Sequence, residues 1–252
     1  MKLASFAVPA AVLSAVALAT GMARAAEIKV LGTPGVREFY AELMPEFERA
    51  SGHKVSTEWA GTVDVMKRIG GVETVDLVVM ARDALDELTK QGKIVPASRV
   101  DLARSGIGIA VRAGAPRPDI ASPEAVKQTL LAAKSIAYSS GPSGVYFAGL
   151  IERMGIADAI KSKMMQVAPG GSVGELVARG EAEIAIHQQS ELLPVHGIDI
   201  VGPLPPDIQK VTLFSAGLHV DARESNAAKA LAAFLTAPAA VPVIKKHGMD
   251  PG

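Results

Sequence analysis

The chain has 252 residues, with 26 basic and 26 acidic side chains and no cysteine. The balanced charge argues against a nucleic-acid-binding protein, which normally carries a basic excess, and the 49% share of apolar residues argues against intrinsic disorder. The lack of cysteine excludes disulfide scaffolds, zinc–thiolate sites, iron–sulfur clusters and cysteine nucleophiles.

The first 25 residues predict a cleaved secretory signal peptide. Lys2 supplies a positive charge, residues 6–20 form an alanine-rich apolar stretch, and Ala23-Arg24-Ala25 gives the small-x-small pattern of a cleavage site. The apolar stretch is shorter than the roughly 20 residues that a membrane span requires, which disfavours a membrane anchor. We therefore expect export to the periplasm and removal of residues 1–25.

After residue 26, short apolar runs alternate with segments of helical periodicity. The predicted strands are 28–31, 54–60, 75–80, 106–112, 135–140, 164–168, 183–187 and 211–220. The predicted helices are 36–47, 65–69, 83–90, one opened by Ser122-Pro123, 143–154, 172–179 and 225–235. This alternation is typical of an α/β protein with largely parallel sheets covered by helices on both faces.

Two extended runs, 106–112 and 211–220, could connect two such α/β units. Lobe one would then comprise residues 26–107 plus 212–252, and lobe two residues 108–211. Two lobes joined by two strands form a hinge with a cleft between them. Periodicity alone also permits one continuous sheet.

Almost the whole chain after the signal resembles the type II periplasmic solute-binding proteins, in the branch that resembles molybdate-binding protein. The resemblance is carried by IKVLGTPGVREFYAELMPEFERASGHKV, VDLVVMARDALDEL, PSGVYFAGLIERMGI, LVARGEAEIAIH and NAAKALAAFLTAPAAVPVIKKHG, in this order. It implies two α/β lobes, a small anionic ligand in the cleft, no cofactor, a monomer, and delivery of the ligand to an ABC permease in the inner membrane.

Four corners between a strand and a helix carry small or hydroxyl residues, and ligands of open α/β sheets bind at such corners. They are residues 32–36, 60–62, 140–144 and 169–172. Free backbone N–H groups and the positive end of a helix favour an anion there. Helix capping by Thr33, Thr62, Ser143 and Ser172 is the alternative for any single corner.

The resemblance also implies which residues contact the ligand. These are Thr33, Gly35, Val36, Gly61, Thr62, Arg82, Ser143, Gly144, Gly170 and Gln188. The chain departs from molybdate binders where Gly35 replaces a ligand serine and Gln188 replaces a tyrosine. Because amide side chains suit a planar carboxylate, we expect a small organic anion, a di- or tricarboxylate, rather than molybdate.

Three charged or titratable residues lie near the corners. Arg82 directly follows a strand and could bind a carboxylate with its guanidinium fork, or it could pair with Asp83 or Asp86 in solvent. Arg37, one residue into a helix, is expected to face solvent. His187 ends a strand at the cleft edge as a structural residue, a ligand donor or a proton shuttle.

One motif suggests different chemistry. Gly170-Gly171-Ser172-Val173-Gly174 fits the G-x-S-x-G pattern of a serine hydrolase, with Asp199 or Asp221 and then His247 in hydrolase order. However, Ser172 and Glu175 also form the capping box S-x-x-E, which explains the serine without catalysis. The five histidines are scattered, so no metal site is expected.

The sequence therefore predicts a periplasmic solute-binding protein without a catalytic residue. The alternative is an isomerase, because aconitate isomerase resembles the same family. Moving a double bond between carboxylated carbons needs a base, a returned proton and donors for the developing charge. His187 is the candidate base, with Tyr146 or Glu191 as partners.

Overall fold

The computed structural model describes residues 25–168 and 171–252, so residues 1–24 of the predicted signal peptide and Gly170 lie outside the described residues. The strands are β1 (Glu27–Gly32), β2 (Lys54–Trp59), β3 (Leu77–Ala81), β4 (Val100–Arg112), β5 (Ile136–Tyr138), β6 (Met164–Gln166), β7 (Ile184–Gln188), β8 (Ile198–Pro203), β9 (Val211–Leu218) and β10 (Asp250–Pro251). The α-helices are α1 (Arg37–Ser51), α2 (Thr62–Gly70), α3 (Arg82–Lys90), α4 (Pro123–Ala132), α5 (Pro142–Arg153), α6 (Ala157–Ile160), α7 (Val173–Ala178), α8 (Gln189–Leu192), α9 (Ser225–Leu235) and α10 (Val241–Lys246).

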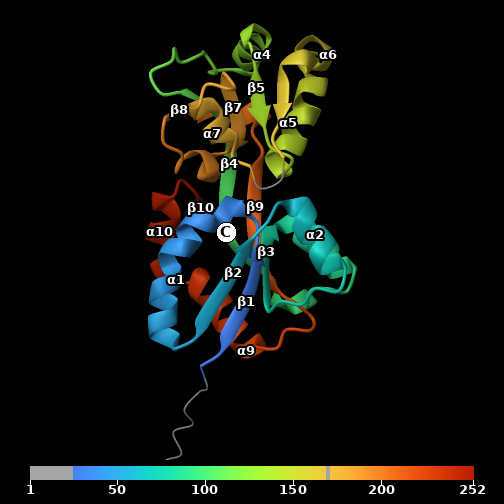
Figure 1. Cartoon of the computed structure of the whole chain (residues 1–252), viewed down its shortest axis with the longest axis vertical. Helices are drawn as coiled ribbons and strands as arrows, with labels where there is room; N and C mark the ends of the chain where they lie inside the picture. The colour runs from blue at the N-terminus through green and yellow to red at the C-terminus, as the bar shows by residue number, and fades with distance from the viewer. Residues whose placement is uncertain (1–24, 169–170) are drawn as a thin grey trace, which may run out of the picture.

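The chain forms two α/β lobes stacked along the long axis, with β4 and β9 running between them (Figure 1). The hydrogen-bonded strand order is β2-β1-β3-β9-β4-β7-β5-β6, with β8 and β10 also paired to β4. One continuous path of strands therefore passes through both lobes. The two arrangements that periodicity permits, two lobes joined by two strands and one continuous sheet, are present together.

The long strand β4 connects the lobes by changing partners along its length. Its first part pairs with β9 as far as Gly106, and from Ile107 onward it pairs with β7 and β8. The second connection runs through Gln209, whose amide accepts a hydrogen bond from the Ile107 N–H (2.8 Å) and donates one to the Ile107 carbonyl (3.0 Å). This side chain ties the two connections together at the hinge.

The sheet is mixed, which corrects the expectation of largely parallel sheets. The β1–β2, β1–β3, β5–β6 and β5–β7 pairs are parallel, whereas every pair that involves β4 or β9 is antiparallel. The two connecting segments run in opposite directions through the hinge, so each must lie antiparallel to some of its neighbours.

Each lobe has a hydrophobic core on both faces of its sheet. In lobe one, α1, α9 and α10 cover one face and α2 and α3 cover the other. In lobe two, α4, α5 and α6 cover one face and α7 the other. The predicted helix opened by Ser122 is confirmed, since its hydroxyl accepts a hydrogen bond from the Ala125 N–H (3.1 Å).

Within the described residues, no single helix is long and apolar enough to cross a membrane. The bent pair of α9 and residues 238–246 passes such a test by length and composition only. Side chains of both segments, such as Leu231 and Ile244, are buried in the lobe-one core.

Candidate functional site

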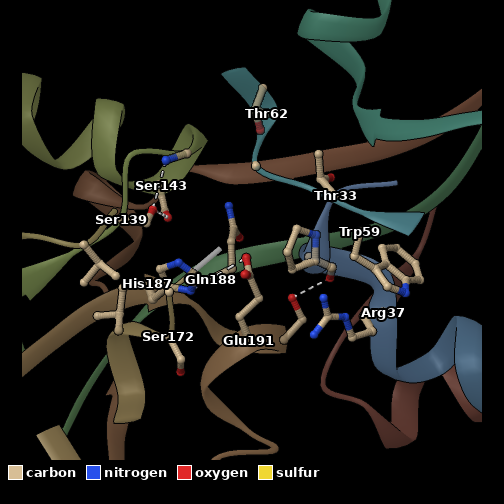
Figure 2. A pocket seen from close by; sticks show the side chains of 18 of the residues that line it. Thr33, Arg37, Trp59, Thr62, Ser139, Ser143, Ser172, His187, Gln188 and Glu191 are labelled. Carbon is tan, nitrogen blue, oxygen red and sulfur yellow. Dashed lines mark hydrogen bonds and ion pairs between the residues drawn. The ribbon is translucent and has the colours of Figure 1, made fainter. Parts of the chain in front are cut away.

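A cavity of about 570 Å³ opens between the two lobes, beside the hinge (Figure 2). Lobe one lines it with the segments that precede α1 and α2, and lobe two lines it with the segments that precede α5, α7 and α8. The volume lies in the range of roughly 300–1,000 Å³ that is usual for small organic ligands.

The lobe-one wall contains Thr33, Gly61 and Thr62, as the sequence predicts, together with Trp59 and Arg37. Thr33 is buried at the end of β1, and its hydroxyl has no hydrogen-bond partner among the described residues. Trp59 ends β2 and is held edge-on by Tyr40, with ring centroids 5.3 Å apart. An unpartnered buried hydroxyl that lines a cavity is suited to bind a ligand, because leaving it unpaired costs free energy.

Gly35 also lines the cavity, and the structure explains why no serine stands there. A Cβ atom on Gly35 would lie 2.3 Å from the ring of Phe214 on β9, which itself lines the cavity. The Gly35 carbonyl accepts a hydrogen bond from the Ser190 hydroxyl of α8 (2.8 Å), so this corner joins the two lobes.

The lobe-two wall is built from polar groups that bond to one another. Ser143, near the start of α5, lies 3.1 Å from the hydroxyl of Ser139 at the end of β5. The Gln188 amide, at the end of β7, donates a hydrogen bond to the Thr212 hydroxyl (2.7 Å), and its oxygen has no partner among the described residues. Rotating this amide by 180° would let Thr212 donate to the oxygen and free both N–H groups for an anion.

His187 and Glu191 lie side by side in the cavity, with His187 Nδ1 3.7 Å from a Glu191 carboxylate oxygen (Figure 2). Both side chains are largely buried. His187 lies in β7 and Glu191 in α8, so the turn from the strand into this helix brings the two side chains together. A histidine beside a carboxylate is an arrangement that can accept and return a proton.

The capping alternative for the hydroxyls holds at one of the four corners. Thr33 makes no cap hydrogen bond, the cap position before α2 is Gly61 rather than Thr62, and the one before α5 is Gly141 rather than Ser143. Only Ser172 caps its helix, by accepting a hydrogen bond from the Glu175 N–H (3.3 Å). The other three hydroxyls are therefore not engaged in capping.

Several predicted contact residues lie elsewhere. Arg82 is not part of the cavity, and its guanidinium lies 3.8 Å from Asp101 on β4 rather than beside Asp83 or Asp86. Val36 is buried in the lobe-one core. Gly144 lets α5 approach β5, since a Cβ atom there would collide with the Ser139 carbonyl.

Arg37, unlike Arg82, lies at the cavity. It is exposed, as expected, but it also lines the cavity, where its guanidinium lies 5.5 Å from the centre of the Trp59 ring. Ser139, Trp59 and Ser190 also line the cavity and were not predicted. Hydroxyl and aromatic residues at strand ends were the available signal for the first two, whereas nothing local marks Ser190.

The hydrolase interpretation gains no support from the described residues. His247 bonds to Glu42 on α1 (2.8 Å) and does not meet Ser172 in the cavity. In the part of the chain that the structure describes, no three His, Asp or Glu side chains are grouped so as to hold a metal ion.

The sequence of the chain matches several known proteins. The family model of the bacterial extracellular solute-binding proteins matches residues 28–250. The aconitate isomerase of a Pseudomonas species is 38% identical over 230 residues, 89% of this chain and 87% of that protein. Molybdate-binding protein ModA of Azotobacter vinelandii is 27% identical over 246 residues, 92% of this chain and 95% of that protein.

The fold matches a solved structure as well. The periplasmic molybdate-binding protein of Azotobacter vinelandii superposes with a TM-score of 0.74 at 19% identity, over 89% of this chain and 99% of the solved one.

Proposed function

This chain belongs to the bacterial extracellular solute-binding protein family, and on that premise we propose that it captures a small di- or tricarboxylate in the interlobe cavity and delivers it to an ABC permease. The observation that carries the proposal is the convergence of α1, α2 and α5 on one cavity by their N-terminal ends, with Thr33, Thr62 and Ser143 not used as caps. Helix N-termini attract negative charge. Hydroxyls that are not engaged in capping add donors for it.

The choice of a carboxylate over an inorganic oxyanion is supported by Gly35 and Gln188. Phe214 fills the space that a side chain on Gly35 would need, so the wall loses a hydroxyl there. Gln188 contributes an amide, which can face the plane of a carboxylate with two N–H groups. The cavity volume of about 570 Å³ also leaves room for an organic ligand.

A thermal-shift and calorimetry screen of the mature protein tests the proposal. The ligands are succinate, tricarballylate, cis-aconitate, trans-aconitate, molybdate and sulfate. We expect the carboxylates to raise the melting temperature, since a ligand at about 100 times its Kd stabilises by about 2.7 kcal/mol. Stabilisation by molybdate or sulfate alone would contradict the proposal.

The second candidate is isomerisation of a tricarboxylate, and the pair of His187 and Glu191 in the cavity favours it. The 38% identity to a protein named aconitate isomerase supports the same reading. In this reaction His187 removes a proton from the saturated carbon of the substrate, and the electron pair spreads over the neighbouring double bond and carboxylate. Return of the proton to the other end of the allylic system moves the double bond, with Glu191 holding the imidazole in position.

Proton NMR in deuterated water separates the two candidates. The pure mature protein is incubated with cis- or trans-aconitate, and the vinyl signals are followed. Interconversion or deuterium uptake that disappears in His187→Gln and falls in Glu191→Gln would make the protein an isomerase. Saturable binding with unchanged spectra assigns it to capture alone.

A further inference from the structure

Arg37 occupies a position where a cation is locally unfavourable. It is the first residue of α1, and the partial positive charge of a helix N-terminus repels a guanidinium there. Among the described residues no carboxylate lies within ion-pairing distance of Arg37, although Glu38 lines the same cavity. A cation at a helix N-terminus without a compensating ion pair is locally unfavourable, and such unfavourable placements are expected at functional positions.

The guanidinium is held over a rigid aromatic surface. Arg37 lies 5.5 Å from the centre of the Trp59 ring, and Tyr40 fixes that ring at an interplanar angle of 89°. The Tyr40 hydroxyl in turn lies 2.8 Å from Thr57 Oγ1 on β2. Gly32 of β1 leaves room for the Trp59 ring, because a Cβ atom on residue 32 would lie 2.6 Å from a ring atom. Stacking on a ring leaves the N–H edge of an arginine available for a ligand.

The remaining wall of the cavity carries no permanent positive charge. Arg37 is the one lysine or arginine among the described residues that line it. The opposite wall offers hydroxyls, an amide, His187 and His196, together with the carboxylates of Glu175 and Glu191. Figure 2 shows Arg37 and Trp59 on the side of lobe one and Ser139, Ser143 and His187 on the side of lobe two. The two walls differ in chemistry, so a ligand with two separated anionic groups would satisfy both.

We propose that Arg37, supported by Trp59, binds a second carboxylate of the ligand and so selects dicarboxylates and tricarboxylates over monocarboxylates. The inference rests on the proposed capture of a carboxylate in this cavity. The first carboxylate binds to Ser143 and Gln188 on the lobe-two wall and to Thr33 on the lobe-one wall. The second accepts hydrogen bonds from the guanidinium fork in a bidentate manner.

Calorimetry with matched ligands tests this assignment. Butyrate and succinate have four carbons each and differ by one carboxylate, and they are titrated into the parent, Arg37→Gln, Arg37→Lys and Arg82→Gln. We expect Arg37→Gln to weaken succinate binding by about tenfold to a hundredfold and to leave butyrate binding nearly unchanged. Arg37→Lys should be intermediate, since lysine keeps the charge but lacks the fork. Arg82→Gln, which removes an arginine outside the cavity, should match the parent.

The fluorescence of Trp59 gives an independent measurement, because the chain contains a single tryptophan. Succinate should change this emission when it engages Arg37, butyrate should change it much less, and Arg37→Gln should abolish the difference. If Arg37→Gln keeps the succinate-over-butyrate preference of the parent, the inference is overturned while carboxylate capture stands. If the parent binds neither these ligands nor tricarballylate, the proposed function itself fails.

Discussion

The two walls of the cavity are organised differently. On lobe two, Ser143 bonds to Ser139, and His187 lies beside Glu191. The Gln188 amide donates to Thr212 on β9, although its oxygen has no partner among the described residues. On lobe one, the Thr33 hydroxyl has no partner among the described residues, and Arg37 stacks on a ring without an acid. The lobe-two wall is thus largely preorganised, with the Gln188 oxygen as the exception, and the lobe-one wall presents groups that await a partner.

This difference indicates a division of labour between the lobes. Preorganised donors bind a ligand at low entropic cost, because little rotamer freedom is lost. Groups without partners gain a full hydrogen bond only when the ligand arrives, so they favour the closed arrangement in which both lobes contact it. The Ser190–Gly35 hydrogen bond keeps the lobes joined near the hinge. Substitutions on the two walls should therefore have different consequences.

The largest effect is expected on the lobe-two wall, at Gln188. Gln188→Ala removes a buried donor to a charged ligand, which typically costs about 1.5–3 kcal/mol, or about tenfold to a hundredfold in affinity. Ser143→Ala should act in the same direction. Calorimetry with the best carboxylate of the screen measures both losses.

The neighbouring Gln189 is a matched control, because it packs beside Gly108 and does not line the cavity. Gln189→Ala should bind like the parent. Equal affinities for the Gln188 and Gln189 variants would show that the preorganised wall does not contact the ligand.

A smaller effect, with opposite signs for stability and binding, is expected on the lobe-one wall. Thr33→Val keeps the shape of the side chain and removes a buried hydroxyl that has no partner among the described residues. Relieving such a group should stabilise the unliganded protein by about 1 kcal/mol. Affinity should fall about tenfold, since the hydroxyl no longer reaches the ligand.

Urea unfolding and calorimetry on the same Thr33→Val sample separate these two quantities. A variant that is less stable than the parent without ligand would mean that the hydroxyl already has a partner. In that case the contrast between the walls would not hold.

Much of this arrangement could be predicted from local sequence. The alternation of strands and helices places Thr33, Thr62, Ser143 and Gln188 at strand ends that meet at one cavity. The predicted helix 225–235 agrees with α9. These features depend on periodicity and turn chemistry, which act over a few residues.

The features that were missed depend on contacts between distant segments. Ser190 meets Gly35 across 155 positions of sequence, and Arg82 pairs with Asp101 because α3 lies beside the start of β4. The role of Gly35 follows from Phe214, which approaches from β9. No local pattern encodes these pairings, because they appear only when the chain crosses between lobes. The lobe boundaries at residues 107 and 211 stay a prediction.

The third expected effect distinguishes capping from ligand binding within lobe two. Ser172 lines the cavity, yet its hydroxyl caps α7. Ser172→Ala should lower the free energy of unfolding by about 1 kcal/mol, as for a lost cap, and leave affinity nearly unchanged. Thermal unfolding and calorimetry are the measurements. A tenfold loss of affinity at unchanged stability would place Ser172 among the ligand contacts.

The smallest effect concerns His219, which does not line the cavity. It tests whether low pH reduces the stability of the fold or the affinity of the site for its ligand. His219 is 2% exposed, its Nδ1 accepts a hydrogen bond from the Asp221 N–H (3.1 Å), and its Nε2 has no partner among the described residues. Burial lowers the pKa of this imidazole below its ordinary value of 6.5. Below about pH 6.5 the unfolded chain therefore binds a proton that the folded chain does not.

Stability should consequently fall as the pH drops from about 6.5 toward the pKa of His219 in the folded protein. One group contributes a slope of at most about 1.4 kcal/mol per pH unit. His219→Asn keeps an acceptor for the Asp221 N–H and removes the titrating ring, so it should flatten the dependence of unfolding free energy on pH in this range. The pH dependence of ligand affinity should be the same in parent and variant, because His219 does not line the cavity. If urea unfolding at pH 7.5, 6.5 and 5.5 gives parallel curves for parent and variant, the loss of stability in acid does not arise from His219, and this prediction is wrong.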